Sequence, residues 1–363
     1  MLSLGEETYR RRQGRILKGL EDVGAEAFLV TCPENCFYLS GFSGEGVLTV
    51  SPAGSWLLTD FRYLETAEEE VRAAEPVRIE GGWVQAVRKL AQDRGWRRVA
   101  FESRHLTYDR YRELTEALAP ASLVPTAGLV EGLRRVKEEA EIERLREAAR
   151  LTDAAFAHLV ERVRPGLTER ELALEIDCFL RRNGSEGVSF PTIVAAGPRS
   201  ARPHALPGNE PVREGDLLLA DFGAVWLGYH GDLTRTVAVA RAGEKEREVY
   251  AVVLAAQEKA LAAVRPGVSG AEIDTLAREE ISRAGYGDCF GHRLGHGVGL
   301  AVHEEPGLGG EEVILEPGMV VTVEPGIYVP GWGGVRIEDL VLVTENGAEV
   351  LSRAPKNFLI VGR

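Results

Sequence analysis

Four acidic residues occupy matching positions in two predicted β-hairpins. Asp221 follows four apolar residues, and Glu324 follows three valines and a threonine, so both carboxylates end strand-like runs. If the first turn is centred between residues 226 and 227, Asp221 lies directly opposite Asp232. A second turn centred on Gly331 places Glu324 opposite Glu338 in the same way. Because opposed side chains share a face with their Cβ atoms about 5 Å apart, this spacing predicts two close pairs of carboxylates.

Carboxylates in such apolar strands need a cationic partner, because an uncompensated buried charge is costly. No lysine lies close in the sequence, and only Arg235 and Arg336 flank the two hairpins. The alternative is metal, since carboxylates at this spacing suit two divalent ions about 3.5–4 Å apart. His296, in a glycine-rich segment where the backbone can approach closely, adds one imidazole. A ligand set dominated by oxygen favours manganese, cobalt or iron over a structural zinc site.

The elements that must position these residues form a repeated pattern. Helical periodicity predicts helices over 137–163 and 168–183, followed by the first hairpin over 216–240. Two further helices are predicted over 244–264 and 270–285, and the second hairpin follows over 320–344. Helices followed by a carboxylate-bearing hairpin therefore occur twice. We expect an α+β domain with two related halves.

The first third of the chain predicts a separate α/β domain. Helices are expected over 6–23, 63–74 and 108–118, and strands over 27–30, 47–50, 55–58 and 99–102. The expected division of the chain is an N-terminal domain over 1–126, a linker over 127–136 and a second domain over 137–363.

Composition excludes some partners. With 56 acidic and 43 basic residues the net charge is −13, which disfavours nucleic acid and anionic membranes as partners. No apolar run approaches the roughly 20 residues that span a bilayer, and the arginines near the N-terminus are not followed by the apolar segment of a signal peptide. The four cysteines form no CxxC pair, which favours reduced thiols in a cytoplasmic protein.

Six short motifs follow one another along the second part of the chain. They are Asp221-Phe222-Gly223, Asp232-Leu233-Thr234-Arg235-Thr236, Gly295-His296-Gly297-Val298-Gly299, Val302-His303-Glu304, Val323-Glu324-Pro325-Gly326-Ile327-Tyr328 and Val335-Arg336-Ile337-Glu338-Asp339. In this order they resemble the motifs of the pita-bread metallopeptidases, the family of methionine aminopeptidases, aminopeptidase P and prolidase. The resemblance covers 137–363, and the first third is similar, more loosely, to the creatinase-like N-terminal domain of the Xaa-Pro branch through 38–42 and 59–63. It implies an α/β N-terminal domain followed by a pita-bread catalytic domain with pseudo-twofold halves.

The resemblance implies a metal role for each residue of the ligand set. Asp221 would chelate one ion, Asp232 and Glu338 would bridge two ions, and His296 and Glu324 would complete the second site. The expected cofactors are two divalent ions, with manganese or cobalt preferred and iron or zinc as alternatives. A water molecule activated by the ions would attack the scissile carbonyl, and Glu324 would also shuttle the proton.

The resemblance assigns further residues to the substrate. His204 and His303 match histidines that contact the substrate amide and stabilise the oxyanion, and His292 matches a histidine lining a proline pocket. Arg235 and Arg336 are predicted neighbours of the carboxylates, and Arg336 can also reach substrate. The remaining histidines match no motif and are interpreted as structural: His105, His158 and His230, the last at a turn tip.

The N-terminal domain favours the Xaa-Pro branch over the methionine aminopeptidases. The expected activity is hydrolysis of an N-terminal Xaa-Pro bond in short peptides, as Xaa-Pro dipeptidase or as aminopeptidase P. In this branch the N-terminal domain mediates dimerisation, so a homodimer is expected. A methionine aminopeptidase, a creatinase-like hydrolase that acts on no peptide, and a pure binding module are the alternatives.

The choice between the two Xaa-Pro activities depends on a clamp for a free carboxylate. A bidentate arginine is the usual solution, and many prolidases carry one between the second histidine and the fourth ligand. The segment 306–319 contains no arginine or lysine, and it adds Glu311 and Glu312. This departure weakens strict dipeptidase specificity unless Arg336 or a partner subunit substitutes, whereas the compact length favours a microbial prolidase. Both activities therefore stay open.

Overall fold

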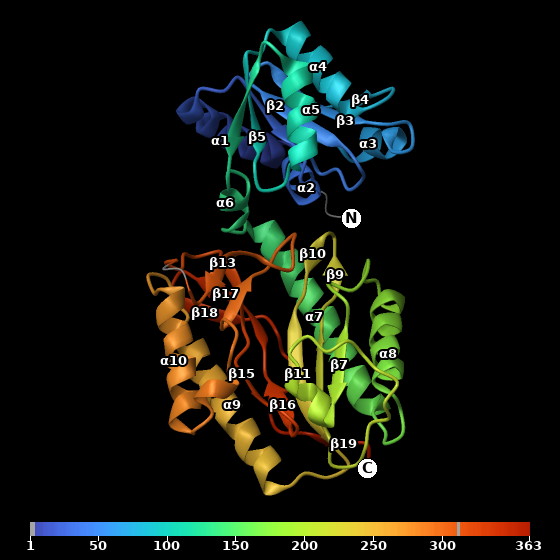
Figure 1. Ribbon diagram of the computed structural model, residues 1–363, viewed down its shortest axis with the longest axis vertical. Helices are drawn as coiled ribbons and strands as arrows, with labels where there is room; N and C mark the ends of the chain where they lie inside the picture. Colours follow the sequence, from blue (N-terminus) through green and yellow to red (C-terminus); the bar gives the residue numbers. More distant parts are fainter. Residues whose placement is uncertain (1–3, 311–312) are drawn as a thin grey trace. The chain divides into compact units, whose positions relative to one another are not determined.

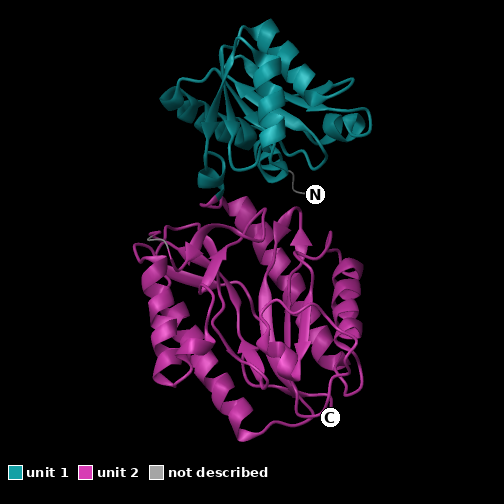
Figure 2. Cartoon of the chain, in the orientation of Figure 1, with its two compact units in different colours: residues 1–134 teal, residues 135–363 magenta. Residues whose placement is uncertain are grey.

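The computed structural model describes residues 4–310 and 313–363, which form two compact units, Met1–Arg134 and Arg135–Arg363 (Figure 2). The boundary falls inside the segment 127–136 that the sequence predicts as a linker. Glu311 and Glu312 lie outside the described residues. Among the described helices, none has the length and apolar character that crossing a membrane requires.

The first unit is a six-stranded sheet with helices. Its strand order is β4-β3-β2-β1-β5-β6, and every strand except β2 runs in the same direction. The elements are α1 Glu6–Val23, β1 Ala27–Val30, α2 Pro33–Ser40, β2 Val47–Ser51, β3 Gly54–Thr59, α3 Leu64–Glu70, β4 Glu75–Arg78, α4 Trp83–Arg94, β5 Arg98–Glu102, α5 Tyr108–Leu118, β6 Ser122–Thr126 and α6 Glu131–Arg134.

The predicted α/β pattern of this unit is confirmed, with one boundary error and several omissions. The helices over 6–23 and 108–118 and the strand over 27–30 have the predicted bounds. The predicted helix over 63–74 is too long, because the chain leaves the helix at Val71 and then forms β4 beside β3. That parallel pairing is a tertiary contact, which local periodicity does not report. Helices α2 and α4 and strands β4 and β6 were not predicted.

The second unit has two halves of similar construction. Its elements are α7 Glu139–Arg162, α8 Glu169–Arg182, β7 Ile193–Ala196, η1 Gly197–Ala201, β8 Leu217–Phe222, β9 Val225–Trp226, β10 Tyr229–His230, β11 Leu233–Val239, α9 Glu244–Ala263, α10 Gly270–Arg283, η2 Gly287–Cys289, β12 Gly295–Gly297, β13 Glu304–Leu308, β14 Val320–Val323, β15 Gly326–Val329, β16 Gly333–Arg336, β17 Asp339–Thr344, β18 Gly347–Val350 and β19 Ile360–Val361.

Each half packs a helix pair against a sheet. Helices α7 and α8 share a core with the sheet β19-β11-β8-β7, through residues such as Phe156, Ile176 and Leu218. Helices α9 and α10 share another core with the sheet β13-β12-β14-β17-β18, through residues such as Val253 and Ile273. Figure 1 shows α8 and the pair α9–α10 on opposite sides of this unit, with strands between them. The repeat predicted from the sequence is confirmed.

The register of the first hairpin differs from the prediction by two residues. Asp221 pairs with Thr234, and not with Asp232. The physical reason is the turn, in which Leu227 and Gly228 both have positive φ and Trp226 pairs with Tyr229, so the centre lies one residue later than predicted. Because side chains alternate between faces with a period of two, a shift of two leaves both aspartates on the same face.

The register of the second hairpin is confirmed, although its two long strands are each divided. The pairs Gly326–Arg336 and Val323–Asp339 both agree with a turn centred on Gly331. The ladder stops between β14 and β15 and again between β16 and β17, which are the positions of Glu324 and Glu338. The predicted opposition of these carboxylates therefore occurs at a gap in the ladder.

The two halves meet through side chains of β11. The Thr234 hydroxyl donates to a Glu338 carboxylate oxygen at 2.6 Å, and the Glu338 amide donates to the Thr234 carbonyl at 3.1 Å. Arg235, which is buried, forms an ion pair of 2.6 Å with the buried Asp339. These buried polar contacts fix the relative position of the two halves, because separating the halves would leave buried charges unpaired.

We predict that Gly223→Ala destabilises the second unit. A Cβ at Gly223 would lie 1.8 Å from the Gly231 carbonyl oxygen, which is backbone of the same hairpin. We expect a loss of about 2 kcal/mol of unfolding free energy, as for other overpacked sites. Denaturant unfolding followed by circular dichroism measures it. Gly347→Ala is the matched control, because nothing lies within 4 Å of its added Cβ, and equal losses in both variants would contradict the argument.

Candidate active site

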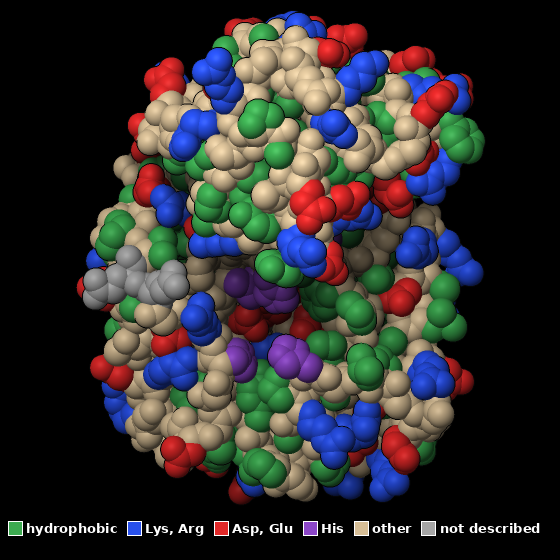
Figure 3. Space-filling view, turned by 45° about the horizontal axis from the view of Figure 1, so that its top comes forward, with side chains coloured by type: hydrophobic (Ala, Val, Ile, Leu, Met, Phe, Trp, Pro, Cys, Tyr) green, Lys and Arg blue, Asp and Glu red, His purple; other side chains and the backbone are tan. Residues whose placement is uncertain are grey.

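One cavity of the second unit, with a volume of about 580 Å³, gathers the residues singled out from the sequence. Figure 3 shows histidine side chains around a hollow that has acidic side chains at its floor. The site residues predicted from the sequence all line this cavity, and they are His204, Asp221, Asp232, His292, His296, His303, Glu324, Arg336 and Glu338.

The five candidate metal ligands come from both halves. Asp221 lies near the end of β8 and Asp232 just before β11, whereas His296 is the central residue of β12. Glu324 and Glu338 occupy the gaps in the second hairpin. Gly295 permits the close approach of β12 to β14, since a Cβ there would lie 2.0 Å from the Thr322 carbonyl oxygen. Glycine at that position is what brings the imidazole to the carboxylates.

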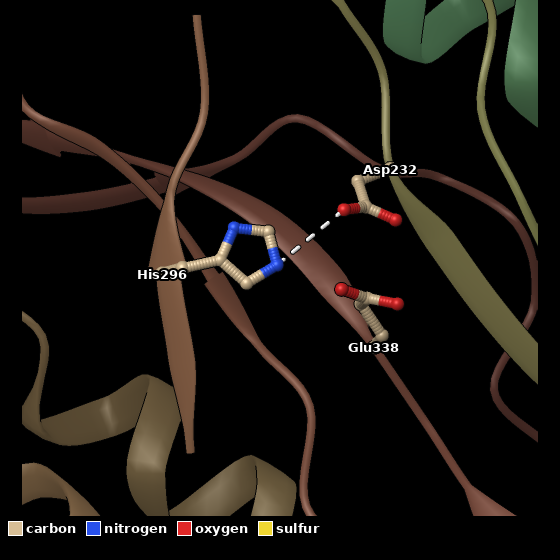
Figure 4. A group of neighbouring side chains, drawn as sticks. All are labelled: Asp232, His296 and Glu338. Atoms are coloured by element: carbon tan, nitrogen blue, oxygen red, sulfur yellow. Dashed lines mark ion pairs between the residues drawn. The ribbon is translucent and has the colours of Figure 1, made fainter. Parts of the chain in front are cut away.

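The ligand atoms of three of these residues are close enough to hold one ion. Atoms of Asp232, His296 and Glu338 all lie within 4.8 Å of one another (Figure 4). The His296 Nε2 atom lies 3.6 Å from Asp232 Oδ2 and 3.5 Å from Glu324 Oε1. An imidazole with surrounding carboxylates is a donor set that divalent transition metals accept.

The electrostatics of the cluster require more positive charge than the described residues around it supply. Burial raises the pKa of Asp232 well above its usual range, and the neighbouring Glu338, Asp221 and Glu324 raise it further. Burial, with Asp221 close by, raises the pKa of Glu338 to about 8. Burial raises the pKa of Glu324 strongly as well. Carboxylates perturbed in this way are expected where a cation normally binds.

Two further observations fit a metal site. Asp221 Oδ1 is buried without a hydrogen-bond partner among the described residues. Burial lowers the pKa of His296 to about 4, so the ring is neutral near pH 7 and can ligate through a lone pair. An orphaned carboxylate oxygen, a neutral imidazole, three buried carboxylates and the partly buried Glu324 together make a set that divalent ions would satisfy.

The two arginines predicted beside the carboxylates have different positions. Arg336 lines the cavity, forms an ion pair with Asp221, and donates to the Thr234 hydroxyl at 3.0 Å and to the Tyr328 hydroxyl at 2.9 Å. Arg235 does not line the cavity. It donates to the Glu338 carbonyl and binds Asp339, so it holds the backbone of Glu338 from outside.

The histidines predicted to contact substrate surround the carboxylates. The ring of His303 lies 4.2 Å from that of His296, and His204 lies on the segment after η1. His292 Nε2 lies 2.8 Å from the Tyr328 hydroxyl. Burial lowers the pKa of His292 to about 4, and the charges of Arg336 and Arg278 lower it further. The hydrogen bond between His292 and the Arg293 backbone opposes this shift. His292 is therefore neutral near pH 7.

Two residues beside this site were missed in the sequence. Tyr328, whose pKa burial raises to about 12, links His292 to Arg336. This tyrosine ends the fifth of the six sequence motifs, but the motif alone predicts no role for its hydroxyl. Arg293 lines the cavity next to His292. Its position immediately after His292, a candidate substrate-binding residue, was the one feature of the sequence that could have predicted a place in the cavity.

The histidines interpreted as structural lie elsewhere. His158 contacts Glu175 at 3.1 Å and stacks on Phe179. His230 is in β10, where its amide donates to the Gly299 carbonyl at 2.9 Å. His105 belongs to the first unit. None of the three is among the residues that line the cavity.

Comparison with known proteins places this geometry in a family. Residues 143–345 match the metallopeptidase family M24, and residues 12–136 match the creatinase/prolidase N-terminal domain. The uncharacterized peptidase YqhT of Bacillus subtilis (strain 168) is 42% identical over 341 residues, which span 93% of this chain and 97% of that protein.

Solved structures agree with the sequence match. The Xaa-Pro dipeptidase from Bacillus anthracis has a TM-score of 0.94 at 41% identity, covering 97% of this chain and 100% of that chain. The X-Pro aminopeptidase from Thermotoga maritima MSB8 has a TM-score of 0.90 at 36% identity, covering 96% and 100%. The resemblance and the pita-bread fold that the sequence motifs predict are thereby confirmed. This chain belongs to metallopeptidase family M24, with a creatinase/prolidase N-terminal domain preceding its catalytic domain.

Proposed function

We propose that this protein is a dinuclear metal-dependent exopeptidase that hydrolyses the Xaa-Pro bond of short peptides, acting as an Xaa-Pro dipeptidase. The observation that carries the proposal is the convergence of one neutral imidazole and four carboxylates, three of them buried and Glu324 partly buried, in a single cavity. That set suits divalent ions, and the names of the similar proteins point to the same class of bond.

The ligand set would serve two ions. Asp221 would hold one ion, His296 and Glu324 would complete the site of the other, and Asp232 and Glu338 would be shared between them. Manganese or cobalt suits this oxygen-rich set best. When bound, such ions polarise the scissile carbonyl and lower the pKa of water. Arg336 forms an ion pair with Asp221, which orients this carboxylate and opposes the rise in its pKa that burial causes.

The remaining steps belong to side chains that line the cavity. Glu324 takes a proton from the attacking water and gives it to the proline nitrogen, so that the carbon–nitrogen bond breaks and the amine leaves. His204 and His303 donate hydrogen bonds to the carbonyl oxygen as it becomes an oxyanion. Burial lowers the pKa of His303, so its neutral ring carries the single N–H that this role needs.

The second substrate residue faces His292, Tyr328 and Arg336. Proline has no backbone N–H, so a wall whose acceptors are already engaged, as those of Tyr328 and His292 are, costs the substrate nothing. Arg293, beside His292 in the same cavity, is the cation that the segment 306–319 lacks. Its guanidinium can bind the carboxylate that follows proline in a dipeptide, and this favours the dipeptidase over aminopeptidase P.

We further propose that the enzyme is a cytoplasmic homodimer. All four cysteines are free thiols, which fits a reducing compartment. The first unit exposes two large aromatic side chains, Phe61 and Tyr108, at 71% and 73%. Exposed aromatic residues are enriched where proteins associate, so this unit supplies the surface for the second copy.

We predict that Asp232→Ala abolishes both metal binding and turnover, because Asp232 bridges the two ions. Elemental analysis after loading with Mn²⁺ and desalting measures the first, and hydrolysis of an Xaa-Pro dipeptide measures the second. His158→Ala is the control, since His158 pairs with Glu175 away from the cavity. An Asp232→Ala protein that retained its full metal content would contradict the bridging role.

We predict that His303→Ala retains its metal but loses kcat. Removal of one donor to an oxyanion commonly lowers kcat by about 10²-fold or more, whereas His303 is not one of the proposed ligands. Parallel measurements of metal content and of steady-state kinetics check both parts. Unchanged kcat would remove His303 from the mechanism.

We predict that Arg293→Met raises KM for an Xaa-Pro dipeptide by about tenfold, since a hydrogen bond to a charged group contributes roughly that much. The C-terminal amide of the same dipeptide is the internal control, because it has no carboxylate to lose. The KM for the amide should stay unchanged in the variant.

Longer substrates complete this experiment. The unaltered enzyme should prefer the dipeptide to the same sequence extended by two residues, and a Met-Ala-Ser peptide should not be cleaved. Preference for the extended peptide would indicate aminopeptidase P. Cleavage of the methionyl peptide alone would indicate a methionine aminopeptidase.

A further inference from the structure

Helix α10 presents an ion pair to the segment that carries His292. Asp274 and Arg278 lie four residues apart, which places them on one face of the helix. Arg278 Nε lies 2.6 Å from Asp274 Oδ2, and its Nη2 lies 3.0 Å from Oδ1, so the pair is bidentate. Neither residue is among those that line the cavity.

The pair binds the backbone of the neighbouring segment at three points. Arg278 donates to the Phe290 carbonyl at 3.0 Å and to the His292 carbonyl, and the Leu294 amide donates to Asp274 Oδ1 at 2.9 Å. The guanidinium also lies 4.4 Å from the centre of the Phe290 ring. Three alternate residues are thus held by two side chains.

The segment 290–294 needs such support because it belongs to no regular element. It lies between η2 and β12, so sheet hydrogen bonds do not fix its course. Buried backbone groups outside helices and sheets must find other partners, and Asp274 and Arg278 supply three of them. Leu294 in turn accepts a hydrogen bond of 2.8 Å from the Glu324 amide, so the segment is attached to the site at its other side.

His292 is the side chain that this arrangement positions. Its Nε2 atom lies 2.8 Å from the Tyr328 hydroxyl, and its ring meets the Phe290 ring edge-on at 5.0 Å. A displacement of the His292 backbone would break the contact with Tyr328 and open the wall of the cavity. The position of this histidine therefore depends on Arg278, which binds its backbone carbonyl.

We propose that Asp274 and Arg278 are positioning residues for proline specificity, which hold His292 in place from outside the cavity. The inference rests on the proposed function, in which His292 faces the proline ring. A correctly placed His292 favours proline over alanine at the second position of the substrate, because the larger proline ring gains more contact with the wall of the cavity. The Asp274–Arg278 pair thus affects the choice of substrate without touching the substrate.

The experiment compares kcat/KM for an Xaa-Pro and an Xaa-Ala dipeptide in Arg278→Met. We expect the proline-to-alanine ratio to fall about tenfold, the usual size of a lost hydrogen bond from a charged donor, through KM more than kcat and with metal content unchanged. Asp274→Asn should lower the ratio in the same direction, and Arg278→Lys should restore part of it. Arg283→Met is the matched control, because the exposed Arg283 on the same helix pairs only with Glu280 among the described residues.

A double-mutant cycle separates positioning from a general loss of structure. In a His292→Ala background, Arg278→Met should change the ratio by less than about twofold, since residues that act through one another are not additive. A second tenfold loss in that background, or an unchanged ratio in Arg278→Met alone, would overturn the inference and leave the proposed function standing. An unaltered enzyme without preference for proline would overturn both.

Discussion

The burial of negative charge around one cavity is the constraint on which the second unit depends. Four carboxylates with raised pKa values share the cavity, and among the described residues one arginine, Arg336, forms an ion pair with any of them. Such a cluster is unstable in an apolar core without further cations. The backbone around it follows this requirement: the second hairpin interrupts its ladder at Glu324 and Glu338, and glycine lets β12 approach β14.

Two arginine side chains outside the cavity fix the backbone of residues that line it. Arg235 holds Glu338 by its backbone, and Arg278 holds His292 in the same manner. In both cases an arginine side chain replaces hydrogen bonds that an irregular strand cannot make for itself. The residues in the cavity are therefore free to carry unfavourable charge or unusual protonation, because their main chains are fixed by others.

The sequence predicts the second hairpin better than the first for a physical reason. Gly331 and its glycine neighbours make the centre of the second turn obvious, whereas the first turn requires a positive φ at Leu227, which a leucine rarely adopts. The resulting error of two residues in the register leaves Asp221 and Asp232 on the same face of the hairpin, so the predicted site is unchanged. Arg293 was missed because its place in the cavity depends on the irregular segment 290–294, and β4 was missed because its partner is distant in sequence.

The bond between Thr234 and Glu338 has a thermodynamic consequence. It joins two halves whose carboxylates lie 92 to 117 residues apart in the chain, so the ligand set exists only when both halves are docked. An ion that binds this set binds the native state and not the unfolded chain, and each tenfold excess of free ion over its Kd then adds about 1.4 kcal/mol to the free energy of unfolding. The supply of metal in the cell would thereby regulate how long the enzyme resists proteolysis, in addition to its rate.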